Sequence, residues 1–281
     1  MIIPLIHRLV RFQVRRLGIK SRWLDLEDHQ LHYYEFRHPH PRETLVLLHG
    51  LGTSSSTWYN LYPFFLRNYS IIAPDLAGFG FSTTPRDTPF FSLQEHVSSL
   101  YKVTKHLGIP PFTLVGHSMG GWVAAKYSAA HPEQVRRLIL INTAGMYVEG
   151  TEELRKVFSI RTTADVSRLV NAMWFRYPWY FKPFLPALRS DLLKRHVPEL
   201  VQSVQREDFL DEELNKLTMP VHLIWGRKDM LLSAESVREI KRRVRNLSVD
   251  YIEGCGHVPQ LERPKELLKI LEKITAEGEK L

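Results

Sequence analysis

The chain has 281 residues, of which 44% are hydrophobic and 24% are charged. This length allows one or two domains, and this composition excludes an intrinsically disordered protein. A single cysteine excludes an internal disulfide, and a net charge of +8 favours anionic surfaces as partners. The sequence has no cysteine or histidine pair at zinc spacing, no phosphate-binding glycine loop and no nucleic-acid motif. We therefore expect no metal, no cofactor and no nucleic-acid partner.

Residues 1–20 predict a basic amphipathic helix that contains no acidic residue. One face carries Leu5, Leu9 and Phe12, and another carries Arg8, Arg11 and Arg15. Such a helix can lie in a membrane interface, or it can pack against its own domain or a second subunit, and the sequence leaves these alternatives open. It is too short and too charged to span a bilayer, and it lacks the order of a signal peptide. We expect a cytoplasmic protein, with peripheral contact with an anionic membrane as one alternative.

Short apolar runs separated by helical patterns follow along most of the chain. A hairpin is predicted at 23–26 and 31–36, because a polar turn separates two alternating segments. Further strands are predicted at 45–48, 71–73, 112–115, 138–141, 221–225 and 249–252. Strands that alternate with helices indicate parallel pairing with crossover helices. The sequence thus predicts an α/β fold, with a mostly parallel eight-stranded sheet and helices on both faces.

Ser118 is the candidate nucleophile. It lies in the glycine-rich run 116–121, directly after the apolar strand at 112–115 and before a helical pattern. A serine on a sharp strand-to-helix turn exposes its hydroxyl only if its neighbours are small, and Gly116 and Gly120 meet this requirement.

The other catalytic groups are expected further along the chain, because serine hydrolases with this turn place the acid and then the base after the nucleophile. Asp229 follows the strand at 221–225, and His257 follows the strand at 249–252. Both therefore lie at the carboxyl edge of the sheet, where side chains converge. His257 would take the proton of Ser118, and Asp229 would hold the histidine tautomer. The oxyanion would be bound by the backbone N–H groups of Leu51 and Met119.

Between residues 147 and 218 the alternation of strands and helices stops. This stretch predicts a helical cap, interrupted by prolines, between the core segments 21–146 and 219–281. Its candidate substrate-binding residues are Trp174, Phe175, Trp179 and Phe181. An apolar surface over the nucleophile would bind an acyl chain, although these rings could instead pack the cap onto the core.

Five segments of the chain resemble the α/β-hydrolase superfamily, namely 49–52, 74–82, 116–121, 225–229 and 254–257. The chain is most similar to the lipase and esterase branch that includes monoacylglycerol lipases. The resemblance implies the α/β-hydrolase fold with the cap inserted as a lid after the sixth strand. It also implies a serine hydrolase that cleaves carboxylic esters, including lipid esters, through an acyl-enzyme and without a cofactor. Two alternatives stay open: hydrolysis of carbon–carbon bonds in ring-cleavage products, and a non-catalytic binding protein.

Overall fold

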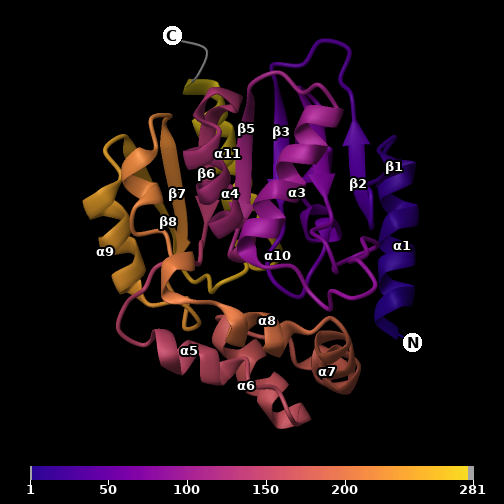
Figure 1. The fold of residues 1–281 in the computed structure, drawn as a ribbon, viewed down its shortest axis with the longest axis vertical. Helices are drawn as coiled ribbons and strands as arrows, with labels where there is room; N and C mark the ends of the chain where they lie inside the picture. The colour runs from indigo at the N-terminus through magenta and orange to yellow at the C-terminus, as the bar shows by residue number, and fades with distance from the viewer. Residues whose placement is uncertain (1, 278–281) are drawn as a thin grey trace.

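An eight-stranded sheet forms the centre of the molecule (Figure 1). The computed structural model describes residues 2–277, so Met1 of the predicted helix and residues 278–281 of the predicted core lie outside it. The strands are β1 (Lys20–Asp25), β2 (Gln30–Phe36), β3 (Glu43–Leu48), β4 (Tyr69–Pro74), β5 (Phe112–His117), β6 (Val135–Ile141), β7 (Val221–Gly226) and β8 (Leu247–Ile252). Their order is β1-β2-β4-β3-β5-β6-β7-β8; β2 pairs antiparallel with β1 and β4, and the other pairs are parallel. The predicted mostly parallel sheet is confirmed.

Helices cover both faces of this sheet. One face packs against α3 (Leu93–His106), α4 (Met119–Ala130) and α9 (Ala234–Arg243), and the other against α1 (Ile2–Arg16), α2 (Tyr62–Phe65) and α11 (Pro264–Glu277). Successive strand residues point to opposite faces, which explains why β3 is apolar throughout its buried part. Val46 and Leu48 pack with the first set of helices, and Leu45 and Leu47 with the second.

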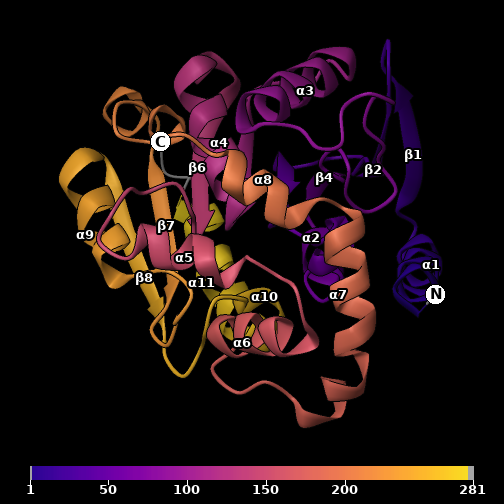
Figure 2. The same ribbon diagram turned by 60° about the horizontal axis from the view of Figure 1, so that its bottom comes forward.

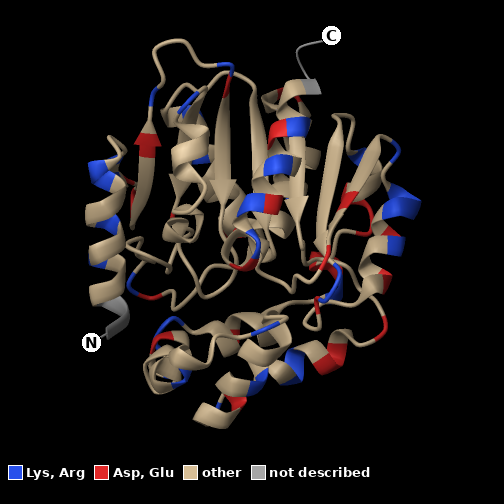
Figure 3. Ribbon diagram, turned by 180° about the vertical axis from the view of Figure 1, so that it is seen from behind, with Lys and Arg blue, Asp and Glu red and all other residues tan. Residues whose placement is uncertain are grey.

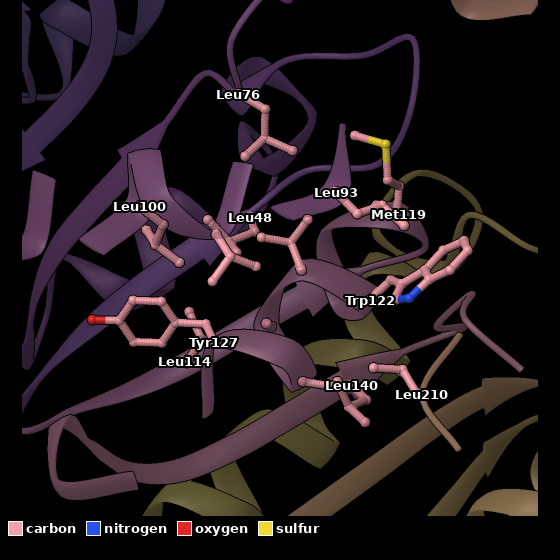
Figure 4. Close-up of a cluster of buried hydrophobic side chains, with 14 of the residues drawn as sticks. Leu48, Leu76, Leu93, Leu100, Leu114, Met119, Trp122, Tyr127, Leu140 and Leu210 are labelled. Carbon is pink, nitrogen blue, oxygen red and sulfur yellow. The ribbon is translucent and has the colours of Figure 1, made fainter. Parts of the chain in front are cut away.

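The core under α3 and α4 reaches Met119, the residue after the candidate nucleophile (Figure 4). Leu48, Leu114 and Leu140, from the central strands, pack there with Trp122 of α4. Met119, the first residue of α4, belongs to the same buried cluster. The turn that carries Ser118 is therefore continuous with the buried core.

Four helices occupy the chain between β6 and β7, and we call residues 147–218 the cap segment. They are α5 (Thr151–Val157), α6 (Thr163–Met173), α7 (Leu185–Lys194) and α8 (Val197–Ser203), with the 3-10 turn η3 (Trp179–Phe184) before α7. A capping box between Thr162 and Asp165 begins α6, and a proline lies in the first turn of α7. These helices lie together across the carboxyl edge of the parallel strands, at the bottom of Figure 1 and in front in Figure 2.

The N-terminal helix α1 packs beside β1 at the edge of the sheet (Figure 1). Val14 is fully buried, and Val10 and Leu17 pack against the same apolar cluster. One predicted alternative, packing against its own domain, is therefore seen for this face of the helix. No helix within residues 2–277 is long and apolar enough to cross a membrane.

Candidate active site

Ser118 lies on the tight turn between β5 and α4. Its backbone has φ 53° and ψ −120°, a region that costs a non-glycine residue about 1–3 kcal/mol. A β-carbon on Gly116 would lie 2.4 Å from the carbonyl oxygen of Gly120, and one on Gly120 would lie 2.4 Å from that of His49. Only glycine fits at either position. The amide of Ser118 donates to the carbonyl of Ile141 at 3.0 Å, which helps to hold the strained turn.

The structure brings Ser118, His257 and Asp229 together. The distance from Ser118 Oγ to His257 Nε2 is 2.9 Å, and that from His257 Nδ1 to Asp229 Oδ2 is 2.8 Å. Asp229 follows β7 and His257 follows β8, and the parallel pairing of these strands brings the two loops to one edge. The backbone N–H of His257 donates to the carbonyl of Met173 in the cap segment at 2.6 Å. The cap segment thus helps to fix the histidine.

The carboxylate of Asp229 accepts hydrogen bonds at both oxygens. Oδ1 accepts from the amides of Leu231 at 2.9 Å and Leu232 at 3.0 Å, and Oδ2 accepts from Asn142 Nδ2 at 2.7 Å as well as from His257. Burial raises the pKa of this carboxyl, but His257, the amide of Leu232 and Asn142 together lower the pKa by more, so it lies below its usual value. An ionised Asp229 requires His257 to carry its proton on Nδ1. Nε2 is then free to accept the hydroxyl proton of Ser118.

Asn142 is a site residue that the sequence analysis did not assign. It follows β6, has φ 41° and is fully buried. Its Nδ2 donates to Asp229, and its Oδ1 accepts from the amide of Gly226 at 3.1 Å. The signal that located Asp229 and His257, a polar residue directly after a parallel strand, also applies to Asn142.

Leu51 and Met119 are the proposed oxyanion donors. Both line a small cavity of about 90 Å³ that Ser118 also lines. Within the described part of the chain, neither backbone N–H donates to another protein group. Met119 is the first residue of α4, so its N–H lies at the positive end of the helix dipole. No group of three or more His, Cys, Asp or Glu side chains within the described residues is placed to hold a metal ion.

A second cavity, of about 620 Å³, extends from Ser118 under the cap segment. Of the four aromatic candidates for substrate binding, Trp174 and Phe181 line this cavity, and Phe175 and Trp179 do not. The side chain of Trp179 is 76% exposed. Phe175 is turned away because its amide donates to Glu262 and its ring packs beside Gly254, with the Arg176 guanidinium over it at 5.2 Å. The cavity lining that the sequence missed includes Tyr177, Phe184 and Leu188.

Three histidines that are buried and neutral, two beside the active site and His96 in α3, should make the fold acid-sensitive. Burial lowers the pKa of His49 to about 4 and that of His96 and His117 to about 3. The unfolded chain binds these protons near pH 6.5, so the stability is complete above that pH and falls as the pH drops towards the folded pKa. Each histidine should cost about 2 kcal/mol of unfolding free energy at pH 5 relative to pH 7.5. Urea unfolding at these two pH values measures the loss, and equal midpoints would contradict it.

Comparisons with known proteins show the family of this chain. A family model of the alpha/beta hydrolase fold matches residues 43–219. Monoacylglycerol lipase ABHD6 of Homo sapiens is 25% identical over 279 residues, which cover 92% of this chain and 82% of the relative. The crystal structure of a membrane phospholipase A, a bacterial virulence factor, is 28% identical with a TM-score of 0.84, over 98% of this chain and 92% of that one.

A carbon–carbon bond hydrolase also shares the architecture. The 2-hydroxy-6-oxo-6-phenylhexa-2,4-dienoate hydrolase of Rhodococcus sp. strain RHA1 is 20% identical with a TM-score of 0.78, over 91% of this chain and 98% of that one. At this identity the likeness shows the fold alone. The family match covers more than half of the chain, and the monoacylglycerol lipase and the phospholipase A are 25% and 28% identical to it. The chain therefore belongs to the α/β-hydrolase family, in its lipase and esterase branch.

Proposed function

We propose that this protein hydrolyses carboxylic esters of lipids, such as monoacylglycerols, through an acyl-enzyme on Ser118. The observation that carries the proposal is the continuous hydrogen-bonded array from Ser118 Oγ through His257 to Asp229, at the end of an apolar cavity. A serine hydroxyl is a weak nucleophile unless a positioned base takes its proton. The named substrates of the monoacylglycerol lipase and phospholipase A relatives support the same substrate class.

The geometry supports a two-step reaction. His257 Nε2 takes the proton of Ser118 while Oγ bonds to the ester carbonyl carbon, and the amides of Leu51 and Met119 bind the oxyanion. Asp229 stabilises the imidazolium, which then gives its proton to the departing alcohol oxygen as the ester bond breaks. A water molecule, deprotonated by His257, attacks the acyl-enzyme in the same way. The carboxylic acid leaves, and Ser118 regains its proton.

We further propose that the cap segment, residues 147–218, is a lid over the acyl chain. The 620 Å³ cavity is lined largely by apolar side chains from this segment, including Met173, Trp174, Phe181 and Phe184. Each methylene buried there contributes about 0.8 kcal/mol to binding. A medium-length acyl chain therefore fits this cavity better than acetate.

Replacement of both Trp174 and Phe181 with alanine should shift the acyl preference. We expect kcat/KM for a decanoate ester to fall by about tenfold or more and that for an acetate ester to change less than about twofold, because only the longer chain contacts these rings. Initial rates with soluble p-nitrophenyl esters measure this. Trp179→Ala is the matched control, because Trp179 does not line the cavity. An equal loss for both esters would contradict an acyl path through the cap segment.

The function itself is tested by one panel of substrates. It contains p-nitrophenyl esters, monoacylglycerols of several chain lengths, and a dienoate ring-cleavage product. We expect turnover of the esters and monoacylglycerols. If only the dienoate were hydrolysed, the activity would be cleavage of a carbon–carbon bond and not of an ester. No turnover of any substrate would indicate a binding protein.

We also propose that the protein is cytoplasmic and contacts an anionic membrane peripherally. The net charge of +8 and the basic N-terminal helix support attraction to an anionic lipid surface. The lipid substrates named for both relatives are consistent with work at such a surface. Small-molecule esters or lipids are thus the expected ligands.

A further inference from the structure

Large apolar side chains are exposed on two segments of the surface. On α1, Leu5, Leu9 and Phe12 are 56%, 57% and 58% exposed. On the turn η3, Trp179 is 76% and Tyr180 is 57% exposed. Clustered exposure of this kind marks an interaction site rather than the scattered apolar residues of an ordinary surface.

The helix α1 has two apolar faces with different roles. Val10, Val14 and Leu17 form the face that packs on the domain. His7 strengthens this contact, since its ring meets Phe81 edge-on at 6.1 Å. The exposed face of Leu5, Leu9 and Phe12 is therefore not needed to hold the helix in place. It is presented on a helix that the rest of the domain already fixes.

The two exposed segments border the opening of the active-site cavity. Ile6 of α1 lines the cavity that contains Ser118, and so do Tyr180, Phe181 and Phe184 of η3. Ile6 is 43% and Phe181 is 41% exposed, so the cavity reaches the surface between these segments. A ligand that covers both segments would also cover this opening.

The charges beside the apolar residues favour an anionic ligand. The first acidic residue of the chain is Asp25, and α1 carries four arginines, Arg8, Arg11, Arg15 and Arg16. Figure 3 shows the blue bands on α1 with no red among them. Arg176 and Lys182 add positive charge next to the aromatic turn. On α1, arginines flank the apolar side chains, and on η3, Trp179 and Tyr180 lie between Arg176 and Lys182 in the sequence. This combination matches the boundary between headgroups and acyl chains of an anionic bilayer.

We propose that the exposed face of α1 and the turn η3 form a single docking surface for an anionic phospholipid bilayer. Leu5, Leu9, Phe12 and Trp179 enter the headgroup boundary. The exposed Arg8, Arg15 and Arg16 contact lipid phosphates, while Arg11 stacks on Trp23 and Phe81. The cavity opening then faces the bilayer, so a lipid ester reaches Ser118 without crossing water. This step rests on the proposed function, because it supplies the substrate for that site.

Vesicle co-sedimentation tests the surface without turnover. Ser118→Ala protein is mixed with vesicles of phosphatidylglycerol and phosphatidylcholine at low and moderate salt. The added change Leu5→Ser/Leu9→Ser/Phe12→Ser should lower the partition coefficient at least about tenfold, since three apolar side chains lose their burial. The control Tyr147→Ser, which removes a 43% exposed ring elsewhere, should leave the coefficient unchanged.

Charge reversal tests the anionic partner. Arg8→Glu/Arg16→Glu should weaken sedimentation strongly, and higher salt should weaken that of the unchanged protein. Lys102→Glu/Lys105→Glu makes the same change in net charge on α3 and should have little effect. Equal loss in both pairs would overturn the assignment to α1.

The fluorescence of Trp179 tests whether the turn η3, which borders the cavity opening, shares the docking surface with α1. Brominated lipids should quench the fluorescence of the Ser118→Ala protein more than that of its Trp179→Phe derivative, because Trp179 enters the bilayer. Absence of this difference would overturn a shared surface, even if α1 binds.

A change in oligomeric state on mutation of the α1 face, without vesicles, would assign that face to a second copy of the chain and would overturn the docking surface. Turnover of soluble p-nitrophenyl acetate by the Leu5, Leu9 and Phe12 variant should stay at the level of the unmodified enzyme, which separates failure of docking from failure of the proposed function.

Discussion

Replacing Ser118 with alanine is expected to lower kcat for any ester by about 10⁶-fold, a loss typical of a serine hydrolase without its nucleophile. The hydroxyl supplies the bond that forms in the acyl-enzyme, and no other side chain in the array with His257 and Asp229 can replace it. Rates with p-nitrophenyl butyrate measure the loss. The residual turnover is that of the oxyanion site and of substrate binding alone.

The same variant should fold as the unmodified protein does. Alanine and serine both have a β-carbon, so the positive φ of this position strains them alike. The backbone hydrogen bonds of Ser118 with Ile141, Gly121 and Trp122 do not involve the hydroxyl. Thermal unfolding should therefore change by only a few degrees, consistent with a loss below about 1 kcal/mol. Labelling by a fluorophosphonate probe should vanish. If a pure, folded variant retained a tenth of the activity, Ser118 would not be the nucleophile.

The sheet could be predicted from the sequence because each strand is a short apolar run with its own boundary signals. Leu45, Val46, Leu47 and Leu48 are buried on both faces of β3, which is the pattern of a central parallel strand. The positions of Ser118, Asp229 and His257 follow from one rule, that the carboxyl ends of parallel strands share an edge. Their convergence needed no information about side-chain packing.

The cap segment could not be predicted to the same depth. The four aromatic candidates lie within eight positions of each other, but the sequence does not show which way each ring points. Phe175 is held by a hydrogen bond from its backbone N–H to the side-chain carboxylate of Glu262, a residue 87 positions later in the chain. Trp179 lies in a 3-10 turn between prolines and points to solvent. Such directions depend on long-range contacts, and local patterns carry no record of them.

The helix α1 shows a different limit. Its sequence has apolar residues over more than half of its circumference, so one pattern fits both packing on the domain and contact with a membrane. The structure assigns Val10, Val14 and Leu17 to packing and leaves Leu5, Leu9 and Phe12 exposed. The alternatives concern different faces of one helix, which a sequence pattern alone does not separate.

Asp229→Asn is expected to lower kcat by about 10⁴-fold without unfolding the protein. The amide oxygen of the new side chain should face the N–H groups of Leu231 and Leu232, because these backbone donors are fixed, whereas the donor on the other side, Asn142 Nδ2, belongs to a side chain that can turn. Its NH₂ group then faces His257 Nδ1, which must become an acceptor. The proton of the imidazole moves to Nε2, where it points at Ser118. The histidine can no longer take the serine proton, which is why so small a change in shape is so costly.

Asn142→Ala is the matched control for this argument, because it removes one donor to Asp229 but leaves the carboxylate charged. The tautomer of His257 is then unchanged, and we expect a loss of only about tenfold, corresponding to one hydrogen bond of about 1.5 kcal/mol to a charged group. Rates with p-nitrophenyl butyrate and fluorophosphonate labelling should rank the proteins in the same order. A loss for Asn142→Ala as large as that for Asp229→Asn would show that positioning of the carboxylate, and not its charge, sets the tautomer.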